Sequence, residues 1–223
     1  MRRYFYDYLI VVFENCKKYD VGFMLDESGS VSHDNWLKEE QFTKIIAKEV
    51  EVGVQGGRAS VITFNSDSLL KIRFSDHLNY KSFERAVDSL HQQSGGTDII
   101  RALNKGLEEM FQTRNGMRQE SEKIAVLITD GSDSNNIHSY RQVAESYRQR
   151  KVKLLVVGVG SVDRSKLKEL VQDQRDFFVA TNFNELLKTF VKGVAENVQG
   201  ACKGKKGYKL FCLTFMQWIK INA

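Results

Sequence analysis

Three short segments of the sequence carry oxygen-bearing side chains that could hold a metal ion. The first contains Asp26, Ser28 and Ser30, the second contributes Thr97 after two glycines, and the third contributes Asp130 before a glycine. None of them contains histidine or cysteine, so a zinc site of the usual histidine and cysteine type is not expected. Hard cations such as Mg²⁺ prefer oxygen ligands, keep several waters and take one or two protein carboxylates. The segments therefore predict one Mg²⁺ site, which could also take Mn²⁺.

The sequence around these segments predicts the strands and helices that position them. Residues 21–26 and 123–130 are continuous apolar runs that each end in a carboxylate, as is typical of strands buried on both faces. Further strands are expected at residues 59–64, 69–74, 152–159 and 177–179. Apolar residues at helical spacing predict helices over residues 36–52, 80–90, 98–111, 140–147, 166–171 and 183–198.

The alternation of strands and helices predicts an α/β fold. We expect a doubly wound, mostly parallel sheet of six strands with helices on both faces. Residues 59–64 and 69–74 are separated by a short polar turn, so this hairpin should supply one antiparallel edge strand. Ligands of open α/β sheets bind beyond the carboxyl ends of the strands, where the strand order reverses. The three oxygen-rich segments are expected to meet there.

The three segments together resemble the metal-ion-dependent adhesion site of von Willebrand factor A domains. Asp26, Ser28 and Ser30, then Thr97, then Asp130 follow that motif in order and in the right places along the chain. The resemblance covers roughly residues 17–202. It implies a Rossmann-like fold and a metal held by these five side chains directly or through water. It further implies an extracellular protein ligand whose Asp or Glu completes the coordination, and in the family ligand binding can shift the last helix.

The cysteines add a second expectation. Cys16 and Cys202 lie just outside the two ends of the periodic region, where a disulfide would close the domain, and Cys212 is left over. The flanking pair is similar to that of the extracellular branch of the family, which includes matrilins and the A domains of non-fibrillar collagens. A secreted location, in the matrix or at a cell surface, is therefore expected.

The two ends of the chain differ in charge from its body. Of the net charge of +5, residues 203–223 carry +5 and residues 1–19 carry +2, which leaves −2 for the body. We expect an N-terminal segment 1–16, compatible with an imperfect or truncated signal peptide, a domain 17–202 and a basic, apolar tail 203–223. Basic ends alone do not predict nucleic-acid binding, and no stretch reaches the roughly 18 apolar residues of a membrane span.

Several residues near the predicted site have ordinary structural interpretations. Asp98 is expected to cap a helix, and Trp36 to pack in the core. We expect Glu27 to be solvated or to tune the charge of the ligands, and Asp67 and Asp133 to lie in surface turns.

An enzyme is not expected. Ser28 and Ser30 have no evident base, since His33 begins a helix without an orienting partner, and the sequence has neither a G-x-S-x-G elbow nor a G-x-G-x-x-G turn. Three alternatives stay open. They are a structural matrix domain with a vestigial metal site, an inserted domain of the integrin α type, and an intracellular assembly module.

Overall fold

The computed structural model describes residues 9–10, 18–131, 133–187, 191 and 211–212. Two compact units are distinguished, one of Lys17–Ala201 and one of Met1–Cys16 with Cys202–Ala223. In the second unit, β1 (Leu9–Ile10) pairs with β8 (Phe211–Cys212) in antiparallel fashion. This pairing of the chain ends was not predicted, because two-residue strands leave no periodic signal.

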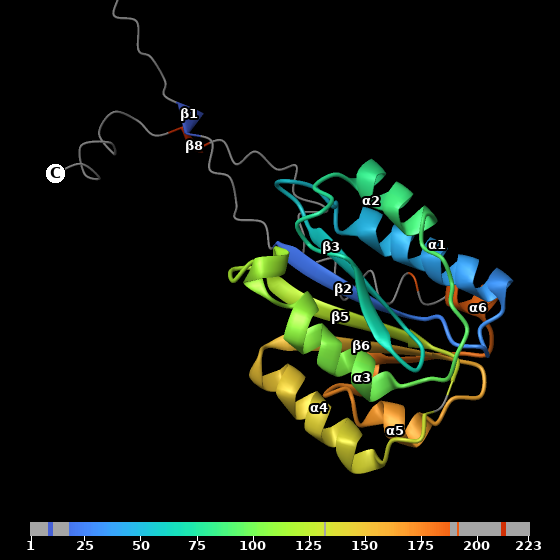
Figure 1. Cartoon of the computed structure of the whole chain (residues 1–223). Helices are drawn as coiled ribbons and strands as arrows, with labels where there is room; N and C mark the ends of the chain where they lie inside the picture. The colour runs from blue at the N-terminus through green and yellow to red at the C-terminus, as the bar shows by residue number, and fades with distance from the viewer. Residues whose placement is uncertain (1–8, 11–17, 132, 188–190, 192–210, 213–223) are drawn as a thin grey trace, which may run out of the picture. The chain divides into compact units, whose positions relative to one another are not determined.

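A six-stranded sheet forms the centre of the first unit (Figure 1). Its strands are β2 (Tyr19–Asp26), β3 (Arg58–Phe64), β4 (Ser68–Ile72), β5 (Glu122–Thr129), β6 (Val152–Val159) and β7 (Phe177–Ala180). The order is β4-β3-β2-β5-β6-β7, and every neighbouring pair is parallel except β3 and β4. The predicted α/β fold with one antiparallel edge strand is confirmed.

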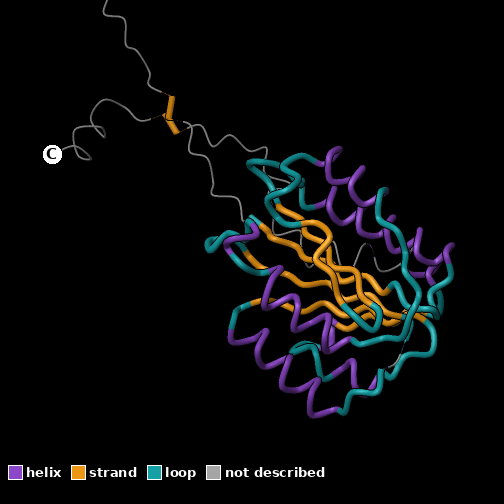
Figure 2. The backbone as a smooth tube through the Cα atoms, viewed as in Figure 1, coloured by secondary structure: helices purple, strands orange, loops and turns teal. Residues whose placement is uncertain are grey.

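Helices cover both faces of this sheet (Figure 2). They are α1 (His33–Glu49), α2 (Tyr80–Asp88), α3 (Ile99–Lys105), α4 (Ile137–Gln149), α5 (Arg164–Lys168) and α6 (Phe183–Glu185). One apolar cluster joins α1, α2 and α6 to one face, and a second joins α3, α4 and α5 to the other. Trp36 on α1 is fully enclosed in the first cluster, so its predicted packing role is confirmed. No helix among the described residues is both long and apolar enough to cross a membrane.

The predicted helix over residues 98–111 changes its winding partway. After Lys105 it continues as a π-helix, η1 (Gly106–Met110), and a 3₁₀ turn, η2 (Thr113–Asn115), follows. A side chain at Gly106 would come within 2.4 Å of Tyr147 and Met24, so glycine allows the helix to approach β2 and α4 closely. The sequence pattern of a helix predicts which face points inward, but it does not predict crowding by elements that are distant in sequence.

Other predicted boundaries differ only at their ends. β4 stops at Ile72 rather than at residue 74, and α5 spans Arg164–Lys168 rather than 166–171. A second 3₁₀ turn, η3 (Gln174–Asp176), precedes β7. The predicted last helix begins at Phe183 as expected, while most of residues 188–198 lie outside the described part of the chain.

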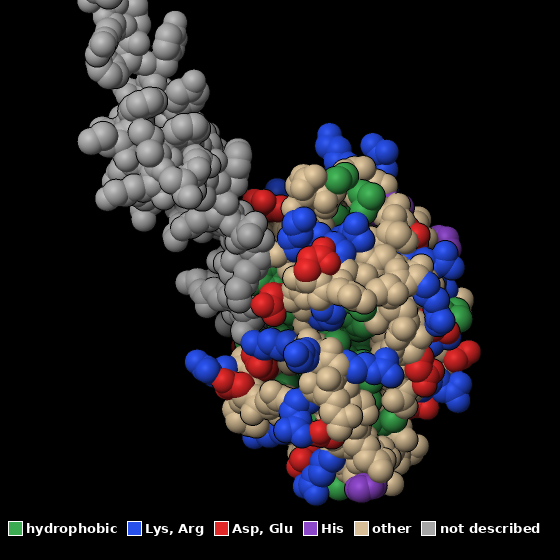
Figure 3. All heavy atoms as spheres, turned by 90° about the vertical axis from the view of Figure 1, so that its left-hand side faces the viewer, with side chains coloured by type: hydrophobic (Ala, Val, Ile, Leu, Met, Phe, Trp, Pro, Cys, Tyr) green, Lys and Arg blue, Asp and Glu red, His purple; other side chains and the backbone are tan. Residues whose placement is uncertain are grey.

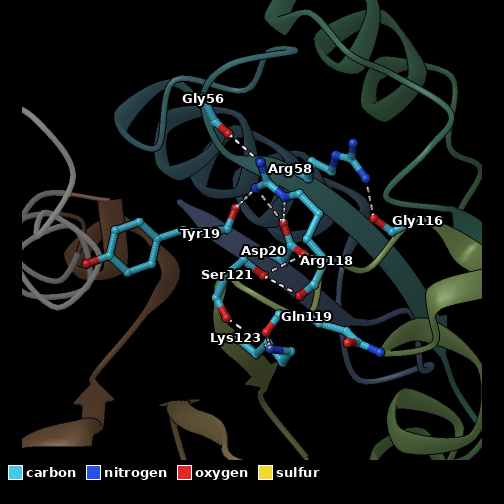
Figure 4. A network of polar contacts seen from close by, with 9 residues as sticks. All are labelled: Tyr19, Asp20, Gly56, Arg58, Gly116, Arg118, Gln119, Ser121 and Lys123. Carbon is cyan, nitrogen blue, oxygen red and sulfur yellow. Dashed lines mark hydrogen bonds and ion pairs between the residues drawn. The ribbon is translucent and has the colours of Figure 1, made fainter. Parts of the chain in front are cut away.

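A buried ion pair joins the elements at the end of the sheet where β2 begins (Figure 4). Arg118 donates through Nε and Nη2 to Asp20 Oδ1 at 2.9 and 2.6 Å, and its backbone N–H donates to Asp20 Oδ2 at 2.6 Å. Ser121 Oγ donates to the same Oδ2 at 2.7 Å. Arg118 also reaches the carbonyls of Gly56 and Tyr19, both at 3.0 Å. One guanidinium thus connects β2, the segment before β3 and the segment before β5.

The surface at this end of the sheet mixes charges of both signs. Figure 3 shows Lys and Arg side chains interspersed with Asp and Glu over this face. A surface that binds nucleic acid requires an extended positive field, and interspersed charges of both signs do not produce one. The charge pattern of this face therefore does not support polyanion binding here.

Candidate metal centre

Asp26 is the last residue of the central strand β2, and its carboxylate is oriented from two sides. Oδ1 accepts a hydrogen bond from the backbone N–H of Ser28 at 3.0 Å, and Oδ2 accepts one from Thr129 Oγ1 at 2.6 Å. Thr129 is itself the last residue of β5, the parallel neighbour of β2. The side chain of Asp26 is completely buried. Its direction is therefore fixed by the ends of two adjacent strands.

The loop after β2 reaches across to the end of β5. Ser28 Oγ and Ser30 Oγ lie 3.0 Å apart, and Ser30 Oγ donates to Asp130 Oδ1 at 2.7 Å. Ser28 is buried, whereas Ser30 is exposed and Asp130 is half-buried. These hydroxyls and the Asp130 carboxylate therefore stand between the buried Asp26 and solvent.

Thr97 is brought to the same place by the loop before α3. The N–H of Gly29 donates to Gly95 O at 2.9 Å, which ties this loop to the first one. A Cβ built on Gly131 would lie 3.1 Å from Thr97 Oγ1 and 3.7 Å from Asp26 Oδ2. Thr97 and Asp26 therefore both border Gly131. The structure brings together all five side chains that the sequence singled out.

The two carboxylates at this centre, Asp26 and Asp130, repel each other when no cation is present. Burial raises the pKa of Asp26 to about 6, and hydrogen bonds from Ser28 and Thr129 only partly offset this. Burial likewise raises the pKa of Asp130. The negative charge of Asp130 adds to the effect at Asp26, so the two carboxylates are close enough to repel each other. A bound cation would relieve both the repulsion and the loss of hydration.

Glu39 is a buried acid behind Asp26 that the sequence analysis missed. It lies on α1, has no exposed surface, and its Oε2 accepts a hydrogen bond from the backbone N–H of Asp26 at 3.1 Å. Burial, followed by the charges of Asp26 and Asp130, raises the pKa of Glu39 well above its usual range. A signal was present in the sequence, because Glu39 occupies an inward position of α1 between Trp36 and Phe42.

Two acids near the centre are buried, against expectation. Glu27 is only 2% exposed, and its Oε2 accepts a hydrogen bond from the N–H of Gln93 at 3.2 Å. The prediction of a solvated Glu27 was wrong because the loop after α2 folds over it. Burial raises its pKa.

Asp133 is also not a surface turn residue. It accepts hydrogen bonds from the N–H of Ile99 at 3.1 Å and from Tyr140 Oη at 2.9 Å, so it holds the start of α3 against α4. The burial of Asp133 depends on contacts with α3 and α4, and the turn-forming residues around it in the sequence do not predict such contacts. Asp67 is exposed as predicted, and Asp98 caps α3 by accepting from the N–H of Arg101 at 2.9 Å.

The donor set fits a hard divalent cation. It offers two carboxylates and three neutral hydroxyls, all of them oxygen ligands, beside a surface open to solvent. Within the described part of the chain, no three acids, histidines or cysteines converge as in a carboxylate-rich or zinc site. Such a set can offset the two charges of the cation with its two carboxylates, and it leaves room in the coordination shell for water or an outside ligand.

Comparison with known proteins assigns the family. The model of the von Willebrand factor type A domain matches residues 20–193. The collagen alpha-1(XII) chain of Notophthalmus viridescens is 27% identical over 190 residues, which cover 84% of this chain and 20% of the relative. The collagen alpha-4(VI) chain of Mus musculus is 29% identical over 175 residues, covering 78% of this chain and 7% of the relative. The chain thus spans a fifth or less of these two relatives.

A smaller relative and a solved structure agree with this assignment. Matrilin-3 of Homo sapiens is 25% identical over 168 residues, covering 73% of this chain and 34% of matrilin-3. The structure of proximal thread matrix protein 1 from the mussel byssus, described as having a zinc-occupied MIDAS motif, matches with a TM-score of 0.73 at 23% identity. That match covers 85% of this chain and 48% of the other. The sequence relatives are structural proteins of the extracellular matrix, and the chain is extracellular like them. By its sequence and its fold, the chain belongs to the von Willebrand factor type A domain family.

Proposed function

We propose that this domain binds one divalent cation, Mg²⁺ or Mn²⁺, and uses it to adhere to another extracellular protein. The ligands are Asp26, Ser28, Ser30, Thr97 and Asp130. The observation that carries the proposal is the convergence of these five side chains at the carboxyl ends of β2 and β5, with two mutually repelling carboxylates among them. When bound, the cation would supply a positive centre for an outside oxygen ligand.

The partner's contribution follows from the coordination positions that the protein leaves open. The two carboxylates can offset the two positive charges of the cation, the hydroxyls of Ser28, Ser30 and Thr97 add no charge, and five side chains leave at least one position of an octahedral shell free. An Asp or Glu of a matrix protein or receptor supplies the charged oxygen that best fills this position. The exposed side of the centre, at Ser30 and Asp130, is where such a group can approach. The surrounding loops would set specificity.

Binding, rather than catalysis, is the function we propose. The serine hydroxyls point at each other and at Asp130. An acid, unlike a histidine held by an orienting partner, is a weak base for activating a serine hydroxyl. The relatives are structural matrix proteins, which agrees with an adhesive role. The integrin-type inserted domain and the vestigial-site matrix domain remain the competing possibilities.

A binding assay decides between adhesion through the metal and contacts elsewhere. A partner captured from matrix proteins in Mg²⁺ should be released by EDTA, and Thr97→Ala should reduce its binding at least tenfold because a metal ligand is lost. The matched control is Thr113→Ala, an exposed threonine at the start of η2, which should bind like the wild type. Full-strength binding in EDTA and by Thr97→Ala would favour the vestigial-site alternative. Replacing Mg²⁺ by Zn²⁺ tests whether the metal of the byssus relative also serves here.

A disulfide between Cys16 and Cys202 is proposed alongside the site, with residues 17–202 as the domain it closes. Both cysteines lie outside the described residues. The loop would span most of the chain, for which the entropic model gives roughly 4–5 kcal/mol of stabilisation. Peptide mapping without reductant should recover a Cys16–Cys202 peptide and a free Cys212. Recovery of Cys16 and Cys202 as free thiols from secreted protein would refute the pairing.

A further inference from the structure

The turn that joins β3 to β4, residues 65–67, lies at the same edge of the sheet as the candidate metal centre. β3 runs parallel to β2, and its last residue, Phe64, pairs with Asp26. The chain therefore leaves β3 beside the end of β2. Unlike the loops after β2 and β5, this turn supplies none of the five proposed ligands. What it contributes to the centre therefore depends on the residues that it contacts.

The turn is held in one shape by its own hydrogen bonds. The N–H of Asn65 donates to the carbonyl of Asp67 at 2.9 Å, and the N–H of Asp67 donates to Asn65 Oδ1 at 2.8 Å. The second bond is the one by which an asparagine side chain closes a turn on the residue two positions ahead. Ser66, between the two, is exposed. The turn can therefore act as a fixed support for a neighbouring loop.

The loop that carries Thr97 is attached to this turn on both sides of Thr97. Ser66 Oγ accepts a hydrogen bond from the N–H of Gly96 at 2.9 Å. The carbonyl of Asn65 accepts one from the N–H of Asp98 at 2.8 Å. Gly96 and Asp98 are the two neighbours of Thr97 in the chain. Because one turn holds the N–H groups of both neighbours, the backbone that carries the Thr97 side chain is fixed before and after it.

The start of this loop also lies against the turn. Asn65 Nδ2 donates to the carbonyl of Ser94 at 3.3 Å. Gly95 has a φ of +151°, and a Cβ built on it would lie 3.3 Å from Asn65 Cγ, so glycine allows the loop to approach the Asn65 side chain. Two consecutive glycines give the loop little conformational preference of its own. Its position is therefore set by contacts from outside the loop.

We infer that the β3–β4 turn, through Ser66 and Asn65, positions the proposed metal ligand Thr97. The inference rests on the proposed function, and it adds two residues that hold a ligand without being ligands themselves. The Thr97 hydroxyl is neutral, so its value to a cation depends on being held at the right place. Replacing groups that orient metal ligands typically weakens metal affinity about 10- to 100-fold. Ser66 is the more informative of the two, because its exposed side chain can be changed without disturbing the core.

Removing the Ser66 hydroxyl tests this role. Titration calorimetry of the full chain with Mn²⁺ should show about tenfold weaker binding by Ser66→Ala. Ser66→Thr keeps the hydroxyl and should bind like the wild type. The matched control is Ser146→Ala, which removes a hydroxyl that donates to the carbonyl of Gln142 within α4 and should also leave Mn²⁺ binding unchanged. Urea unfolding in chelator should give similar midpoints for all four proteins, so that a weaker affinity does not reflect unfolding.

A measurement without metal separates this inference from the proposed function. In chelator, ¹⁵N relaxation of the wild type should give Gly96 and Thr97 order parameters of about 0.85, as in rigid backbone, and clearly lower ones in Ser66→Ala. Unchanged order parameters, wild-type Mn²⁺ affinity in Ser66→Ala, or no recovery of affinity in Ser66→Thr would each overturn the inference. If the wild type bound no Mn²⁺, the proposed function would fail, whereas the order parameters would still show whether the turn holds Thr97.

Discussion

Replacing Asp26 by asparagine should abolish metal binding and at the same time stabilise the metal-free domain at neutral pH. The carboxylate is completely buried and has a pKa of about 6, so its ionised form is unfavourable in the folded state without a cation. A shift of this size corresponds to roughly 1–3 kcal/mol at pH 7. Titration calorimetry with Mg²⁺ and Mn²⁺, and urea unfolding in chelator, measure the two effects. A wild-type affinity retained by Asp26→Asn would contradict the assigned ligand set.

The stability of the metal-free domain should also depend on pH, in a direction set by the raised pKa of Asp26. The folded pKa of Asp26, about 6, lies above the usual value of 3.8 for an aspartate, so the folded state binds more protons between these pH values. Stability of the metal-free wild type should therefore decrease as pH rises from about 4 to about 6. The decrease should be shallower in Asp26→Asn. Metal affinity should move in the opposite direction and weaken below pH 6, because protons compete for the same oxygen.

Two further variants test whether metal binding depends on the proposed ligands and not on a neighbouring acid. Asp130→Ala should also abolish metal binding, since it removes the second carboxylate. Asp98→Asn serves as the control, because asparagine caps a helix as well as aspartate does and Asp98 acts here as the cap of α3. We expect this control to bind metal within a few-fold of the wild type. A complete loss in Asp98→Asn would mean that Asp98 belongs to the site.

Replacing Arg118 by alanine should destabilise the domain by about 3–5 kcal/mol, the usual effect of breaking a buried ion pair from one side. The change leaves the carboxylate of Asp20 buried with no exposed surface, and it removes the donors to the Gly56 and Tyr19 carbonyls. Urea unfolding of Arg118→Ala, Asp20→Ala and the double variant measures the coupling between the two. We expect the double variant to lose clearly less than the sum of the single changes.

A surface ion pair provides the matched control for this experiment. Arg141 donates to Glu169 at 2.8 and 3.0 Å, but its side chain is 59% exposed. Arg141→Ala should therefore lose at most about 1 kcal/mol. If Arg118→Ala lost no more than Arg141→Ala, the buried pair would have no special role. Metal binding should survive in folded Arg118→Ala, because Asp20 and Asp26 lie at opposite ends of β2.

The arrangement of the sheet was predictable from the sequence because its signal is local. Strands buried on both faces require unbroken apolar runs, and the helices that cover them require apolar residues at helical spacing. The five proposed oxygen ligands could also be found from the sequence, since the order of α/β elements places the ends of parallel strands at one edge. Among the neighbouring acids, the cap role of Asp98 and the exposure of Asp67 also followed from the local sequence.

Which acids are buried was decided by the tertiary structure. Glu39 enters the core because α1 lies over the end of β2, and Glu27 is covered because the loop after α2 bends back over the first loop. Asp20, the partner of Arg118, is 98 residues away along the chain, and the sequence around Arg118 does not predict that contact. Sequence periodicity therefore determined the fold, and the spacing of the oxygen-bearing side chains determined the candidate ligands. The electrostatics of the candidate metal centre depend on burial and on the distances between remote segments, which only the folded chain defines.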